Sequence, residues 1–107
     1  MKPMIFSVDE AFEQLRDEGI VCSFRQQQRE TEPVWIRRTR TGEKEFDAEI
    51  VQRFGVNPAC MDNIRPYADR SGFADAEAWV EAIRETHGDL SPGYVHVVER
   101  IEGDNAE

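Results

Sequence analysis

The first clear pattern along the chain is a helical stripe of apolar residues near its beginning. The spacing i, i+3, i+4, i+7 is occupied by Val8, Ala11, Phe12 and Leu15. This period predicts a helix over residues 8–18. Ser7 and Glu10 have the spacing of a capping box at its start, and Gly19 is expected to end it.

Alternating apolar and polar positions follow, and they predict three strands. These strands are expected over residues 20–25, 34–40 and 45–54. The polar stretch between the first two strands, residues 26–33, ends in a proline and is expected to be a loop. Residues 41–43 are expected to form the turn before the third strand.

A second amphipathic helix is predicted after an irregular segment, residues 55–70. Asp75 is a plausible N-cap, and Gly88 is expected to end the helix. The apolar stripe between them consists of Ala76, Trp79, Val80 and Ile83. A final strand is expected over residues 94–101.

This order of elements has no regular βαβ alternation, which favours an α+β fold over a doubly wound sheet. With 107 residues, the chain has the length of one domain. We expect that domain over residues 1–102, followed by a polar tail at 103–107.

The chain is strongly acidic, with 22 acidic against 13 basic residues and a net charge of −9. Only Lys2 and Lys44 are lysines; the other basic residues are arginines. This balance is typical of a protein adapted to high salt, although many ordinary cytosolic proteins are also acidic. The segment 1–6 has no long apolar run, so neither a signal peptide nor a membrane span is expected there. Cys22 and Cys60 lie far apart, which fits a reducing cytoplasm.

One strip of the chain has the opposite charge. Residues 25–44 hold six basic and three acidic side chains, a net charge of +3, so the rest of the chain has a net charge of −12. On a strand, Trp35 and Arg37 share one face, where guanidinium and indole groups suit phosphate and base contacts. The candidate nucleic-acid-binding residues are Arg25, Trp35, Arg37, Arg38, Arg40 and Lys44. Alternatively, these arginines pair with the acidic surface, or Trp35 belongs to the core.

Other chemistry is sparse in the sequence. His87 and His96 have no metal-ligand spacing and no visible nucleophile partner, so we interpret both as structural and expect no metal. No glycine-rich phosphate loop is present, and no cofactor is expected. Phe73 and Trp79 are interpreted as packing together at the helix entry, with a ligand role as the alternative.

Loose motifs along most of the chain resemble the ASCH family within the PUA-like group. They comprise Glu18-Gly19 with a strand to Arg25, the turn Arg40-Thr41-Gly42-Glu43-Lys44, Gly72-Phe73 before Glu77-Ala78-Trp79, and the last strand Tyr94 to Val98. The resemblance implies a small β-barrel with two main flanking helices. It also implies RNA binding through a cleft beside the first helix.

One branch of that family is similar to amidohydrolases that act on acetylated cytidine with a lysine, a threonine and a glutamate. In this sequence the lysine position falls at Val21 and the threonine position at Cys22 or Ser23. A valine cannot perform acid–base chemistry, so catalysis would need a substitute base such as Glu43 or Glu49.

The sequence therefore favours a non-catalytic RNA- or nucleotide-binding domain. Two alternatives stay open. One is a protein-interaction module whose arginines contact an acidic partner chain, and the other is a small amidohydrolase on a modified nucleoside.

Overall fold

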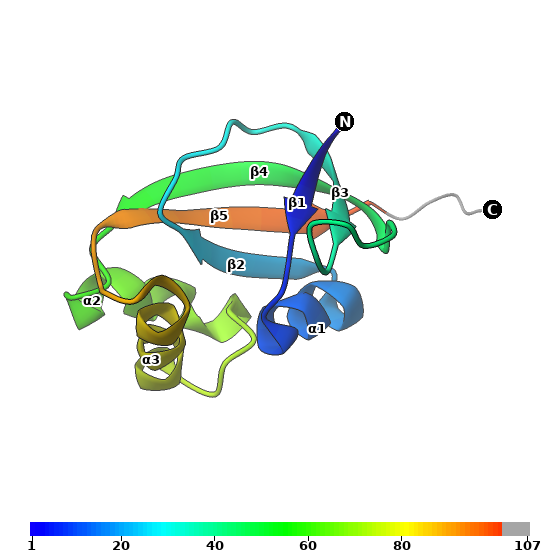
Figure 1. The fold of residues 1–107 in the computed structure, drawn as a ribbon. Helices are drawn as coiled ribbons and strands as arrows, with labels where there is room; N and C mark the ends of the chain where they lie inside the picture. Colours follow the sequence, from blue (N-terminus) through cyan, green and yellow to red (C-terminus); the bar gives the residue numbers. More distant parts are fainter. Residues whose placement is uncertain (102–107) are drawn as a thin grey trace.

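The computed structural model describes residues 1–101, which form a five-stranded mixed sheet with helices packed against it (Figure 1). The strand order is β1-β3-β4-β5-β2. The elements are β1 (Lys2–Ile5), α1 (Asp9–Glu18), β2 (Ile20–Arg25), β3 (Pro33–Arg37), β4 (Phe46–Val56), α2 (Met61–Ile64), the 3₁₀ helix η1 (Arg65–Arg70), α3 (Ala76–His87) and β5 (Gly93–Arg100). The predicted α+β class is confirmed. The predicted barrel is not, because β1 and β2 do not pair and remain the two edges of the sheet. The expected tail at 103–107 lies outside the described residues.

The two predicted helices are present, and their ends follow from local chemistry. Gly19 and Gly88 terminate α1 and α3 in the left-handed conformation, each with φ 83°. Asp75 caps α3, since its carboxylate accepts a hydrogen bond from the main-chain N–H of Ala78 at 2.8 Å. The capping box at Ser7 and Glu10 was wrong: α1 begins after Val8, which makes no side-chain cap.

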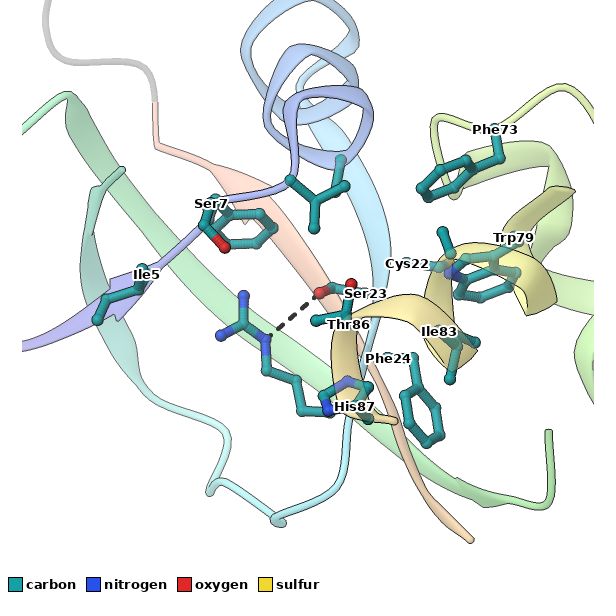
Figure 2. A pocket seen from close by; sticks show the side chains of 15 residues that line it. Ile5, Ser7, Cys22, Ser23, Phe24, Phe73, Trp79, Ile83, Thr86 and His87 are labelled. Atoms are coloured by element: carbon teal, nitrogen blue, oxygen red, sulfur yellow. Dashed lines mark hydrogen bonds between the residues drawn. The ribbon is translucent and has the colours of Figure 1, made fainter. Parts of the chain in front are cut away.

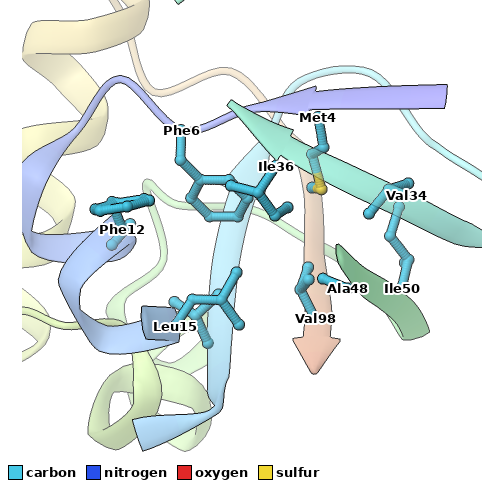
Figure 3. Close-up of a cluster of buried hydrophobic side chains, with 11 residues drawn as sticks. Met4, Phe6, Phe12, Leu15, Val34, Ile36, Ala48, Ile50 and Val98 are labelled. Carbon is cyan, nitrogen blue, oxygen red and sulfur yellow. The ribbon is translucent and has the colours of Figure 1, made fainter. Parts of the chain in front are cut away.

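The inner face of the sheet is apolar at one end and polar at the other. All five strands contribute to one core cluster beneath α1, so the sheet curls around it (Figure 3). A register shift between Ile50 and Gln52 marks a β-bulge in β4, which strengthens the local twist. At the polar end, Ser23 and His96 are cross-strand partners, as are Arg53 and His96. Ser23 and His96 are both buried, and this polar end lies beside the site described below.

The outer face of β2, β5 and the end of β4 packs against the remaining helices. This second cluster contains Cys22, Phe24, Val56, Ile64, Ala68, Ala76, Trp79, Val80, Ile83, Val95 and Val97. The free thiol of Cys22 is buried there, and burial raises its pKa. Trp79 is thus first of all a core residue, as its helical spacing indicated.

Three segments differ from the sequence-based expectation. Residues 2–5 form β1, which was not predicted, and pair in parallel with β3. The irregular segment 55–70 contains α2 and η1. The strand expected over 34–40 ends at Arg37, so Arg38 and Arg40 lie beyond it.

No helix within residues 1–101 combines the length and the apolar character needed to cross a lipid bilayer. Nor do these residues contain a group of three or more His, Cys, Asp or Glu side chains placed to hold a metal ion.

Candidate ligand-binding pocket

A pocket of about 120 Å³ lies at the edge of β2, facing the end of β1, and opens to solvent on one side (Figure 2). Three parts of the chain line it: the segment 5–8 with Ala11 of α1, the β2 residues 22–25, and Phe73 with the inward face of α3. Because β1 and β2 are the two unpaired edges of the curled sheet, the pocket occupies the place where a closed barrel would have a strand pair. We call it the seam pocket.

Local structure explains how these segments meet. Gly19 reverses the chain directly after α1, so that β2 runs back beside the helix. The main-chain N–H of Phe6 donates to the carbonyl of Arg37 at 2.9 Å, which fixes the segment that leaves β1. The cap at Asp75 and the stop at Gly88 place Thr86 and His87 in the last turn of α3, against the pocket.

Arg25 dominates the electrostatics of the pocket. Its guanidinium lies over the ring of Phe6, 4.7 Å from the centroid, and its Nε donates to Ser23 Oγ at 3.4 Å. It forms no salt bridge within residues 1–101. Burial and the nearby Arg29 lower the pKa of Arg25 to about 10, so it is still charged at pH 7.

No carboxylate of residues 1–101 lines the pocket, although the chain is so acidic. His87 is the other titratable nitrogen there, and burial together with the Arg25 charge lowers its pKa. Ser7, Ser23 and Thr86 add hydroxyl groups. The seam pocket is therefore a cationic site that lacks its counter-charge.

The other half of the pocket is apolar and aromatic. Figure 2 shows Cys22, Phe73, Trp79 and Ile83 grouped away from the Arg25–Ser23 hydrogen bond. The two halves together suit a ligand with an apolar or aromatic body and an anionic group.

The predicted basic strip does not converge on one site. Only Arg25 lines the pocket. Trp35 and Arg37 share the other face of the sheet, as predicted, with the Arg37 guanidinium 5.0 Å from the indole centroid. Arg38 instead binds Asp9 and the carbonyl of Phe6, and so fixes the start of α1.

The remaining strip cations do not line the pocket either. Lys44 pairs with Asp47 at 2.8 Å, and Arg29 pairs with Glu32 at 3.2 Å. Arg40 is exposed beyond β3 and forms no salt bridge within residues 1–101. A role of Arg40 and Lys44 in binding stays a prediction.

Sequence reasoning missed most of the pocket. Phe6 and Ser7 belong to the segment after the unpredicted β1, and His87 was interpreted as structural. The available clue was the pair Phe73 and Trp79, for which a ligand role was one alternative; both line the pocket. Glu43 and Glu49, the substitute bases of the hydrolase alternative, do not.

Comparisons with known proteins give no further assignment: no protein-family model, curated protein or solved structure matches this chain.

Proposed function

We propose that this protein is a non-catalytic binding domain for a nucleotide or a nucleotide unit of RNA, held in the seam pocket. The phosphate lies on Arg25, and the base lies in the aromatic half beside Phe73 and Trp79. The observation that carries the proposal is the Arg25 guanidinium, a partly buried cation that lines the pocket without a carboxylate partner.

Withdrawing a charge from water without pairing it costs free energy, and proteins usually pair such groups. Here Arg25 has no carboxylate partner, and the positive charge of the nearby Arg29 lowers the Arg25 pKa further. An oxyanion would remove this cost. Among the basic side chains, arginine is the one suited to planar, two-point contact with phosphate. Stacking on Phe6 holds the guanidinium in place before the ligand arrives.

The size of the pocket agrees with one aromatic ring. A cavity of about 150 Å³ in another protein is known to hold benzene, and the seam pocket has about 120 Å³ and opens outward. The ring of a base therefore fits inside, while the sugar and any continuing chain remain in solvent.

The proposal includes membership of the ASCH family. The curled sheet would then be an open form of the barrel that this family implies. The proposed site is not the basic strip that was expected from the sequence, because Arg25 is the one residue of that strip that lines the pocket.

A second candidate is a protein-interaction surface for an acidic partner. The observation in its favour is the Trp35–Arg37 pair on the opposite face, where Nε of Arg37 is buried without a hydrogen-bond partner within residues 1–101. A partner carboxylate there would complete it.

Calorimetry with the four nucleoside 5′-monophosphates and a short single-stranded RNA tests the proposal. Arg25→Gln should weaken binding at least tenfold, since hydrogen bonds to charged groups contribute about 1.5–3 kcal/mol. Arg40→Gln removes the same charge from the strip but not from the pocket, and it should leave affinity within about twofold. Equal losses in both variants, or no binding by the parent protein, would contradict the proposal.

A further inference from the structure

The free edge of β2 contributes main-chain groups to the seam pocket. In an antiparallel pair, alternate residues turn their N–H and C=O groups toward the partner strand. The N–H of Arg100 donates to the carbonyl of Gly19 at 2.9 Å, and these residues continue the β2–β5 register, in which Ile20 pairs with Glu99. Gly19 and every second residue after it therefore bond to β5. Ile20, Cys22 and Phe24 turn their main-chain groups to the open edge.

Two of these three residues have no partner for those groups. The carbonyl of Ile20 accepts a hydrogen bond from Nε2 of Gln14 in α1 at 3.2 Å. No hydrogen bond within residues 1–101 uses the main-chain groups of Cys22 or Phe24 on that side. Both residues line the seam pocket.

The other edge of the sheet is protected at Pro3. Pro3 in β1 has no N–H, and its carbonyl accepts from the Arg29 guanidinium at 2.9 Å. Proteins usually cover the polar groups of an edge strand in this way. Cys22 and Phe24, by comparison, offer a C=O and an N–H that are left open beside an aromatic cavity and the Arg25 cation.

We propose that the C=O of Cys22 and the N–H of Phe24 recognise the hydrogen-bonding edge of the bound base, an inference that rests on the proposed function. On an extended strand, the carbonyl of one residue and the N–H of the residue two positions later face the same side, so they present an acceptor next to a donor. The Watson–Crick edge of a base presents the complementary groups side by side.

The remaining contacts are consistent with this placement. Arg25 follows Phe24 directly and turns its side chain across the seam to Phe6. Its guanidinium is thus available to the phosphate of the same nucleotide. An extended peptide would use the same main-chain groups. The open edge is only two residues long, however, and its walls are aromatic, which favours one planar ring.

Amide hydrogen exchange measured by NMR tests this inference on the intact protein. The probe is whichever nucleoside 5′-monophosphate binds most tightly. Binding should slow exchange of the Phe24 amide at least tenfold and shift its resonance. The amides of Ser23 and Val21, which already bond to β5, are the matched internal controls and should change little.

A ligand series gives the second readout. Ribose 5-phosphate, which has no base, should bind at least tenfold more weakly than the nucleotide. The nucleotide with its base edge methylated should lose a similar factor. If the nucleotide binds and depends on Arg25 but the Phe24 amide stays unprotected, this inference fails while the proposed function holds.

The other outcomes are equally decisive. Equal binding of ribose 5-phosphate and the nucleotide overturns the base contact. If only an extended acidic peptide binds and protects Phe24, the edge belongs to a protein partner, and both proposals fail. Absence of nucleotide binding overturns both as well.

Discussion

The main-chain N–H of Arg29 donates a hydrogen bond to Nε2 of His96 at 3.1 Å. Nε2 is therefore the acceptor of a neutral imidazole, and the ring proton belongs on Nδ1, which has no partner within residues 1–101. The same Arg29 binds the carbonyl of Pro3 through its side chain. One residue of the loop after β2 thus ties β5 to β1 across the seam.

This bond predicts that the fold loses stability in mild acid. His96 is 0 % exposed, and burial, Arg25 and Arg29 lower its pKa to about 4. An unfolded chain has the ordinary histidine pKa of about 6.5 and binds the proton first. The contribution of His96 is complete above pH 6.5 and is lost as the pH falls toward 4, by roughly 3 kcal/mol.

Urea unfolding of the parent and His96→Gln between pH 4 and 7 measures this effect. The glutamine carbonyl can still accept from Arg29 but does not titrate, so the variant should show a shallower dependence on pH. His87→Gln is the comparison: the pKa of His87 is also lowered, but its ring is only partly buried, so this variant should change the pH dependence less. Parallel pH profiles for the parent and His96→Gln would refute the assignment.

Arg25→Met should raise stability or leave it unchanged while it removes nucleotide binding. The substitution removes a partly buried cation near Arg29 and keeps an apolar chain on Phe6. We expect a gain of about 1 kcal/mol in the free energy of unfolding, measured by urea denaturation. Binding sites often show such a conflict between stability and function. A loss above about 2 kcal/mol would mean that Arg25 serves the fold instead.

Two glycines with similar backbone angles should respond very differently to alanine. A Cβ on Gly72, with φ 90°, would lie 2.2 Å from the carbonyl oxygen of Glu10. A Cβ on Gly19, with φ 83°, would meet no atom within 4 Å. Gly19→Ala should therefore cost only the left-handed backbone penalty of about 1–2 kcal/mol. Gly72→Ala adds a backbone clash and should cost about 3 kcal/mol or more. Chemical denaturation compares them, and equal costs would contradict the close approach.

Rising KCl should raise the thermal midpoint of the protein. With a net charge of −9, self-repulsion opposes the compact state. The screening length falls from about 10 Å at 0.1 M salt to about 3 Å at 1 M, which weakens this repulsion. Calorimetric melting in a KCl series measures the midpoint. A constant or falling midpoint would argue against adaptation to high salt.

The sequence predicted the elements whose ends are decided locally. Asp75 and Gly88 bound α3 because a cap and a left-handed glycine act within a few residues. The sequence did not predict the elements whose position depends on residues distant in the chain. The segment 2–5 carries a proline and no alternation, and it becomes β1 only through pairing with β3. Arg38 holds the carbonyl of Phe6, so the start of α1 is fixed without the predicted capping box.

The candidate site was less predictable than the fold, for the same reason. Trp35 and Arg37 were correctly placed on one face, since strand alternation is local. The convergence of the strip was an assumption about tertiary structure, and the curled sheet separates Arg25 from Trp35. No periodicity in the sequence indicates that β2 is an edge strand, and the seam pocket depends on that position.

The seam pocket combines segment 5–8 with β2 and α3, so its walls come from both ends of the described chain. An unfolded or half-assembled chain has no such cavity and no affinity for its occupant. Ligand binding therefore stabilises the folded state. Above the Kd, each tenfold increase in the free ligand concentration adds about 1.4 kcal/mol to the free energy of unfolding. Heat resistance can then report the identity of the ligand, because among many compounds only a true occupant shifts the melting curve in proportion to the logarithm of its concentration.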